Sequence, residues 1–142
     1  QLQMQAIGLF VNGQDFLIPA EADAQLGHLL RQVKTQVGIK AAQQLLALPV
    51  RPTAIFASND DMAAGVLSHA HRLGLAVPQD LSVAGFDNTP LAEIVWPPLT
   101  TIHQPVREMA YAAASQLFAS DGGVFHQRLD HRLIERGSTA RP

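Results

Sequence analysis

A chain of 142 residues is long enough for one domain with its own hydrophobic core, and 47% hydrophobic against 15% charged residues is typical of a globular protein. The net charge of −2 argues against a nucleic-acid-binding surface on this chain, because binding to phosphates requires clustered lysine and arginine side chains. The absence of cysteine excludes disulfides, thiolate metal sites and cysteine nucleophiles, and it fits the reducing environment of the cytoplasm.

Targeting signals are also missing from the sequence. No apolar run is long enough to span a membrane, and the N-terminus lacks the basic and then apolar pattern of a signal peptide. The first residues, QLQMQAIG, have no initiator methionine and follow the pattern of a last helical turn. We therefore expect the chain to begin within a longer protein, and we predict no membrane association.

The first third of the chain gives mixed signals. Residues 2–7 are expected to end a helix, and residues 10–18 to form a turn and a short strand. Over residues 21–37 a helical pattern is weakened by Gly27, whereas the apolar spacing over residues 39–48 predicts a helix that ends before a proline.

The stretch 53–88 predicts a strand, a helix and a second strand joined by short turns. Residues 54–57 form an apolar run of strand length, and residues 81–86 form another. Between them, residues 61–73 carry apolar side chains at helical spacing, and Gly74 is the expected left-handed stop. The short connection from this helix to the second strand predicts that the two strands are parallel neighbours joined by a right-handed crossover. Both strands would then end at the same edge of the sheet.

Polar residues follow both of these strands. Asn59 and Asp60 come after the first strand, and Asp87 and Asn88 come after the second. Open α/β sheets bind ligands at the carboxyl ends of their strands, and short amide and carboxylate side chains suit a hydroxyl-rich small molecule. The spacing leaves a second interpretation equally open, in which these residues only cap the helix and shape the turns.

The last third continues the alternation of helices and strands. Residues 91–95 predict one or two helical turns, and residues 99–102 predict a third strand. A helix with an apolar face is expected over residues 105–119, then an edge strand within residues 129–135 and a tail over 137–142. This alternation predicts the α/β class with a parallel sheet.

Three further features bear on function. His103 and Gln104 stand at the corner after the third strand, where a hinge fixed by hydrogen bonds is favoured over direct ligand contact. Trp96 lies on a short surface excursion, which favours a subunit contact over the core. The small residues 63–65 form a second apolar side of the central helix, which could pack against another helix of the domain or against a twofold mate.

Catalysis and metal binding find little support. His69 and His71 lie two residues apart on a predicted helix, on nearly opposite faces, so they cannot share a zinc ion. Ser58, His103 and Asp87 could meet at one edge, but the Gly-x-Ser-x-Gly elbow and any glycine-rich phosphate loop are missing. We predict no catalytic residue, no metal site and no cofactor, and hence no enzyme.

Several separate motifs keep a common order and spacing, within residues 52–60 (PTAIFASND), 74–88, 97–105 (PPLTTIHQP) and 133–139 (LIERGST). Together they resemble the C-terminal half of the effector domain of LacI/GalR-type bacterial transcriptional repressors. The resemblance covers residues 38–142 and is loose before them, where the chain carries extra residues after Ile18 and lacks an expected aromatic side chain near the pocket.

The resemblance implies a periplasmic-binding-protein-like effector domain, an α/β fold whose lobes have three layers around a parallel sheet. The whole chain, 1–142, would be the C-terminal part of that domain. Residues 1–100 would belong mainly to the second lobe, residues 101–128 would cross into the first lobe, and residues 129–142 would form the return strand and tail. Most of the first lobe and a DNA-binding helix-turn-helix would lie outside this chain.

The resemblance also implies roles for individual residues. Asn59 and Asp87 would contact hydroxyls of a sugar-like effector, whereas Asp60 resembles a helix cap, and Asp60, His103 and Gln104 are candidates for ligand or hinge contacts. The contact between subunits of a homodimer would include Ala64, Leu67, Ile94, Val95 and Trp96.

The implied function is the effector-sensing and dimerisation portion of a cytoplasmic repressor, which reaches operator DNA only through an N-terminal domain. An effector would act by its different affinities for two lobe arrangements. The alternative is a periplasmic sugar-binding protein of a transport system, which shares the fold, and a hydrolase that uses the same edge is a second rival.

Overall fold

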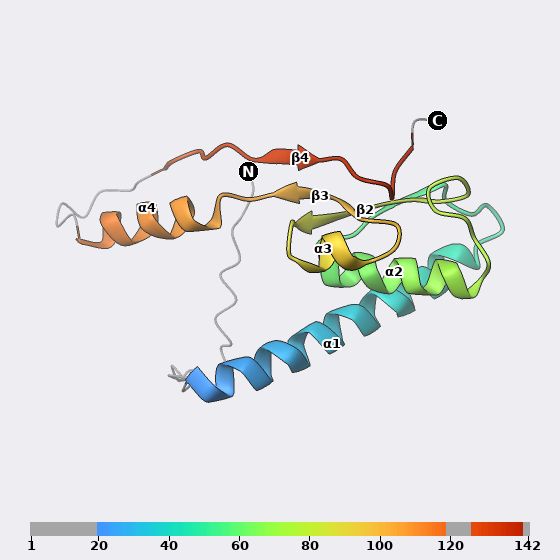
Figure 1. Ribbon diagram of the computed structural model, residues 1–142, viewed down its shortest axis with the longest axis horizontal. Coiled ribbons are helices and arrows are strands. Elements are labelled where there is room, and N and C mark those ends of the chain that lie inside the picture. Colours follow the sequence, from blue (N-terminus) through green and yellow to red (C-terminus); the bar gives the residue numbers. More distant parts are fainter. Residues whose placement is uncertain (1–19, 119–125, 141–142) are drawn as a thin grey trace.

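The structure is a computed structural model that describes residues 20–118 and 126–140 (Figure 1). The predictions for residues 2–7 and 10–18 fall outside the described residues. The elements in chain order are α1 (Ala20–Leu46), β1 (Ala54–Phe56), α2 (Asp60–Arg72), β2 (Ser82–Asp87), α3 (Leu91–Ile94), β3 (Thr100–His103), α4 (Val106–Phe118) and β4 (Arg132–Ile134).

The strands form a four-stranded sheet in the order β1-β2-β3-β4. β1, β2 and β3 are parallel, and β4 pairs antiparallel with β3 at the edge. The register places Ala54 beside Ser82 and Asp87 beside His103. The predicted parallel pair and the predicted edge strand are both confirmed, although β4 is shorter than the range 129–135.

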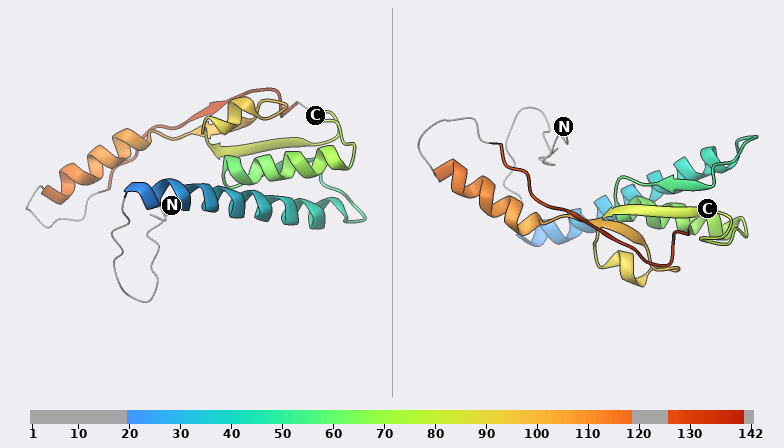
Figure 2. Two further views of the ribbon diagram at one scale, coloured as in Figure 1. Left: turned by 60° about the horizontal axis from the view of Figure 1, so that its bottom comes forward. Right: turned by 90° about the horizontal axis from the view of Figure 1, so that it is seen from above.

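The helices cover the sheet in layers. α2 packs on the sheet, and α1 packs on α2, as Figures 1 and 2 show. The core between these elements consists of small and branched apolar side chains, which suit the close approach of helix to strand. Its fully or almost fully buried members are Ala42, Ala63, Val66, Leu67, Ala70, Leu81, Val83, Ala92 and Leu99.

α1 is one continuous helix where the sequence predicts a clear helix only from residue 39. Gly27 lies within it, with nothing within 4 Å of the place a Cβ would take. A single glycine costs a helix about 1 kcal/mol, which is too little to end one of this length. Gly38 and Gly65 lie where α1 and α2 touch, and a Cβ on either would meet backbone of the other helix.

α4 stands apart from this core. None of its described residues is buried, and Figure 1 shows the helix extending beyond the sheet. The apolar side predicted for this helix is exposed, with Leu117 and Phe118 at 84% and 86% of their full accessibility. The chain then returns through β4 to the sheet.

The tail beyond β4 is built into the core, which the sequence did not predict. Ser138 is fully buried, and its backbone oxygen accepts from the backbone N of Val83 at 2.8 Å. The Ser138 hydroxyl donates to the Val83 oxygen at 2.6 Å and accepts from the backbone N of Thr100 at 2.8 Å. The tail therefore bridges β2 and β3 near their amino ends.

Candidate functional site

The carboxyl edge of the parallel sheet brings together the polar residues that the sequence places after β1 and β2. Asp60 begins α2 directly after β1, and its carboxylate accepts from the backbone N of Thr89, just beyond Asn88, at 2.7 Å. Asp87 ends β2 beside His103 at the end of β3. The predicted convergence of the two corners is confirmed.

Asp60 is the buried centre of this edge. Its side chain is fully buried, Oδ1 accepts from the hydroxyl of Thr101 at 2.6 Å, and Oδ2 accepts from both the N and the hydroxyl of Thr89. Gly85 leaves the space for it, because a Cβ there would lie 2.5 Å from Asp60 Oδ1. Asp60 therefore joins α2 to β3 and to the turn after β2.

The predicted role of Asp60 as the helix cap is wrong, because Asn59 holds that position. Asn59 has extended backbone angles, and its Oδ1 accepts from the backbone N of Met62 at 2.9 Å. A residue with this geometry satisfies one of the free N–H groups of the first turn. The cap uses only the side-chain oxygen, which leaves the Nδ2 amide group as a donor.

Asp87 and Asn88 both have left-handed backbone angles, with φ of 106° and 53°. Such angles are unfavourable for residues other than glycine, and they concentrate at functional sites. Gln104 Nε2 donates to Asp87 Oδ1 at 2.7 Å. Burial raises the pKa of Asp87 above its ordinary value, the hydrogen bond from Gln104 lowers it, and the nearby Asp60 carboxylate raises it again.

Arg136 also reaches this edge, which its place in the sequence does not predict. Its Nη2 donates to Asn88 Oδ1 at 2.8 Å and forms an ion pair of 3.2 Å with Glu93, while Nη1 donates to the Leu99 oxygen. A single basic residue in the LIERGST segment was the only signal, and its partners lie up to 48 residues away in the chain.

His103 lies where a hinge residue is expected. Its Nδ1 lies 3.3 Å from Asn88 Nδ2, within hydrogen-bonding distance, at the end of β3. His103 and Gln104 thus each contact a residue at the end of β2. Both side chains tie the corner before α4 to the carboxyl edge of the sheet.

The residues assigned to a subunit contact do not all reach the surface. Ile94 and Trp96 are 79% and 78% exposed, and Val95 packs partly against the core. Ala64 is half-buried, but Leu67 is 2% exposed and belongs to the core of this chain. The prediction for Leu67 is wrong, because α2 is enclosed between the sheet and α1 and has no free face at that position.

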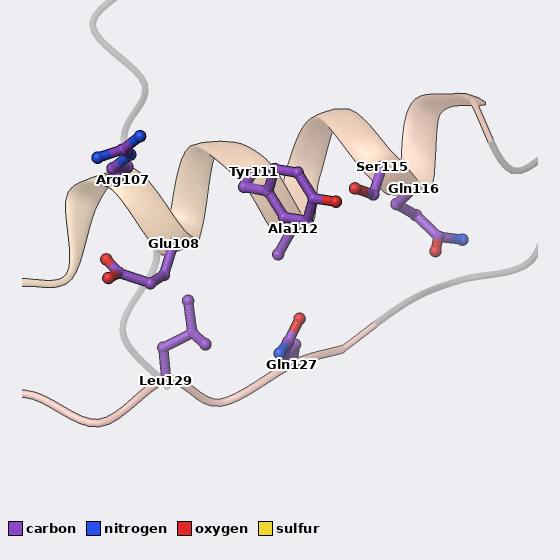
Figure 3. Close-up of a pocket in the computed structure, with 8 residues that line it drawn as sticks. All are labelled: Arg107, Glu108, Tyr111, Ala112, Ser115, Gln116, Gln127 and Leu129. Carbon is purple, nitrogen blue, oxygen red and sulfur yellow. The ribbon is translucent and has the colours of Figure 1, made fainter.

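Other features of the described residues lie away from this edge. A groove of about 720 Å³ runs between α4 and the segment before β4 (Figure 3), and none of the predicted site residues lines it. Within residues 20–118 and 126–140, no group of three or more His, Asp or Glu side chains could hold a metal ion. No described helix is both long and apolar enough to cross a membrane.

The mostly parallel open sheet with a polar carboxyl edge defines a domain of the periplasmic-binding-protein type. The model of the periplasmic binding protein-like domain family matches residues 11–139. The chain belongs to this family and, within it, to the LacI/GalR-type transcriptional regulators.

Curated relatives are bacterial repressors. The HTH-type transcriptional repressor CytR of Escherichia coli K12 is 48% identical over 108 residues, which are 73% of this chain and 32% of the relative. The ribose operon repressor of the same organism is 44% identical over 105 residues, 71% of this chain and 32% of the relative. The chain thus spans about a third of the length of these relatives.

The solved structures that are similar to this chain include further LacI-family regulators. A putative transcriptional regulator LacI from Bacillus cereus subsp. cytotoxis NVH 391-98 is 32% identical with a TM-score of 0.72, covering 75% of this chain and 39% of the other. A LacI family transcriptional regulator from Lactobacillus casei with bound glucose is 37% identical with a TM-score of 0.63. The match covers 74% of this chain and 39% of the other.

Proposed function

We propose that this chain is the effector-sensing and dimerisation portion of a LacI-type transcriptional repressor and that it binds a sugar-like small molecule. The observation that carries the proposal is Asp87, a half-buried carboxylate at the carboxyl end of β2, held with left-handed backbone angles. A carboxylate accepts hydrogen bonds strongly from hydroxyl groups, and its geometry here is fixed before a ligand arrives.

Asn59 supplies the complementary group. Its side-chain oxygen caps α2, so its amide nitrogen is the part that would donate to a ligand oxygen. An acceptor and a donor at one edge suit neighbouring hydroxyls, each of which both donates and accepts. Asp60 is a supporting residue in this proposal, because its carboxylate is fully buried and already accepts three hydrogen bonds.

The relatives support a sugar-like effector. One is named for the ribose operon, and one similar regulator was solved with bound glucose. We place the opposite wall of the pocket in the first lobe, to which α4 would belong, and the helix-turn-helix in the N-terminal part of the whole protein. The effector would then change DNA binding through its different affinities for two lobe arrangements.

For dimerisation we propose the surface formed by Ile94 and Trp96. Both are large apolar side chains that are mostly exposed in this chain, and aromatic residues are enriched at interfaces. The ion pair of Arg136 with Glu93 and its bond to the Leu99 oxygen hold the loop that carries them. A homodimer of a cytoplasmic regulator is consistent with this surface.

We propose binding without catalysis, since the named relatives are transcriptional repressors. The same relatives make a periplasmic sugar-binding protein of a transport system the weaker alternative. The presence of a helix-turn-helix in the full-length protein, together with sugar-dependent binding to operator DNA, would separate the two.

The test is calorimetry on the full-length protein with ribose, glucose and sucrose as probes, chosen after a thermal-shift screen. Asp87→Ala is expected to weaken binding by at least tenfold while thermal unfolding stays cooperative. Asp130→Ala, which removes an exposed carboxylate, is the matched control. Equal affinity in Asp87→Ala and the control would remove Asp87 from the site.

A further inference from the structure

Gln104 occupies the position at which the chain leaves the sheet for α4. β3 ends at His103, and α4 begins at Val106 after Pro105. No residue of α4 is buried, so no packed face of the helix fixes its direction in the described residues. The short segment 103–105 therefore has a large part in setting that direction.

The side chain of Gln104 turns back toward the carboxyl edge of the sheet. Its Nε2 donates to Asp87 Oδ1 at 2.7 Å, which joins the end of β2 to the first residue beyond β3. The backbone N of Val106 donates to the backbone oxygen of Gln104 at 2.9 Å. One residue thus contacts both the carboxylate at the edge and the first turn of α4.

We propose that Gln104 is a positioning residue that couples the state of the Asp87 carboxylate to the start of α4. The amide of Gln104 fixes Oδ1, and a carboxylate has acceptor positions left for a second donor. A second donor on Asp87 changes the charge and the position of the carboxylate that Gln104 holds, and so changes the bond to Gln104. Conversely, a change in segment 103–105 alters the carboxylate that an effector meets, because the coupling of two sites is reciprocal.

The role of this coupling in effector sensing rests on the proposed function. The coupling itself depends only on contacts within this chain. The charges around Asp87 define what the loss of the Gln104 donor does. Burial and the carboxylates of Asp60 and Asp61 raise the pKa of Asp87, while the Gln104 hydrogen bond and Lys34 on α1 lower it. Removal of the donor therefore raises the pKa of Asp87 further.

The test uses the proton as the probe of Asp87, so it is independent of the identity of the effector. NMR of the whole chain with ¹³Cγ-labelled aspartate gives the titration midpoint of Asp87, and Asp87→Asn assigns the signal. Amide shifts over residues 106–109 report the first turn of α4. In the wild-type chain we expect these amides to shift with the same midpoint as the Asp87 carboxyl.

Gln104→Met keeps the length of the side chain and loses the donor. We expect it to move the Asp87 midpoint upward and to remove that titration from the α4 amides. Gln43→Met, at an exposed glutamine on α1, should leave both observations as in the wild type. If Gln104→Met does not fold, Gln104→Asn withdraws the donor by one methylene and is read in the same way.

An unchanged Asp87 midpoint in the Gln104 variant would overturn the positioning role. Wild-type α4 amides that do not respond to Asp87 would overturn the coupling. Sugar binding that depends on Asp87 but is equal in Gln104→Met would contradict this inference and leave the proposed function standing. Both NMR effects without any sugar binding would support the inference and count against the proposed function.

Discussion

The hydroxyl of Thr101 donates a 2.6 Å hydrogen bond to Asp60, 41 residues earlier in the chain, and both side chains are fully buried. The other oxygen of the same carboxylate accepts from Thr89. One side chain thereby ties the start of α2 to β3 and to the turn after β2. It forms the floor of the edge at which Asn59 and Asp87 lie.

Asp60→Ala is expected to lower the free energy of unfolding by about 3 kcal/mol, because the buried Thr101 hydroxyl and the partly buried Thr89 N–H lose their acceptor. Urea denaturation measures the change. Asp130→Ala, at an exposed position, should stay within about 0.5 kcal/mol of the wild type. A similar small loss in Asp60→Ala would contradict the central role of this carboxylate.

Ser138→Ala tests the docking of the tail. Its buried hydroxyl contacts the Val83 oxygen and the Thr100 N–H, and alanine leaves both groups without that partner. The expected loss is about 2 kcal/mol by chemical denaturation. Ser68→Ala, at an exposed position on α2, is the control and should be nearly neutral. Equal effects of the two substitutions would show that the tail adds no stability.

The contact of α1 with α2 predicts opposite outcomes for two glycines. In Gly65→Ala the new methyl group meets backbone atoms of Thr35 and Ile39, so overpacking should cost about 1–3 kcal/mol. In Gly27→Ala the methyl group meets nothing, and better helix propensity should add about 0.5–1 kcal/mol. Thermal unfolding of both variants measures these changes in stability. A stabilised Gly65→Ala would contradict the close contact between α1 and α2.

Trp96→Glu tests the proposed dimer surface. A charge in the centre of an apolar contact should raise the dimer dissociation constant of the full-length protein at least tenfold, measured by sedimentation. Tyr111→Glu is the control, since Tyr111 is also exposed, at 77%, but lies on α4. An unchanged dimer in Trp96→Glu would place the subunit contact elsewhere.

The pKa of Asp87 predicts a dependence of stability on pH. Because that pKa is raised in the folded chain, the stability connected with the group is full at low pH and is lost as the pH rises through the folded pKa. Asp87→Asn cannot ionise, so it should be more stable than the wild type at neutral pH, with a gain that shrinks as the pH falls through the folded pKa and is absent below the ordinary value of 3.8. The affinity of Asp87→Asn for a sugar should be lower than that of the wild type.

Denaturation curves between pH 3 and pH 7 measure the difference, with Asp130→Asn as the control for the loss of one negative charge. A gain from Asp87→Asn that is the same at every pH would assign it to the left-handed backbone, which asparagine adopts more readily, instead of to the buried charge.

The sequence was sufficient for the features that depend on neighbours in the chain. Helical spacing, the stop at Gly74 and apolar runs of strand length gave α2, β1 and β2, and Gly74 does adopt φ of 72°. The motifs around these elements gave the family. Such features need only local backbone preferences and residue order, which a single sequence contains.

Only the tertiary structure decided what each polar residue at the edge does. Asn59 and Asp60 are adjacent and equally suited to a helix cap, and burial beneath Thr101 determines that Asp60 takes the other role. The sequence predicts Leu67 at a subunit contact, but in the structure α1 and the sheet enclose it. The sequence predicts Ser138 in a tail, but in the structure its side chain is buried against Val83. The partners of these side chains come from segments distant in the chain, and their positions exist only once the elements have packed.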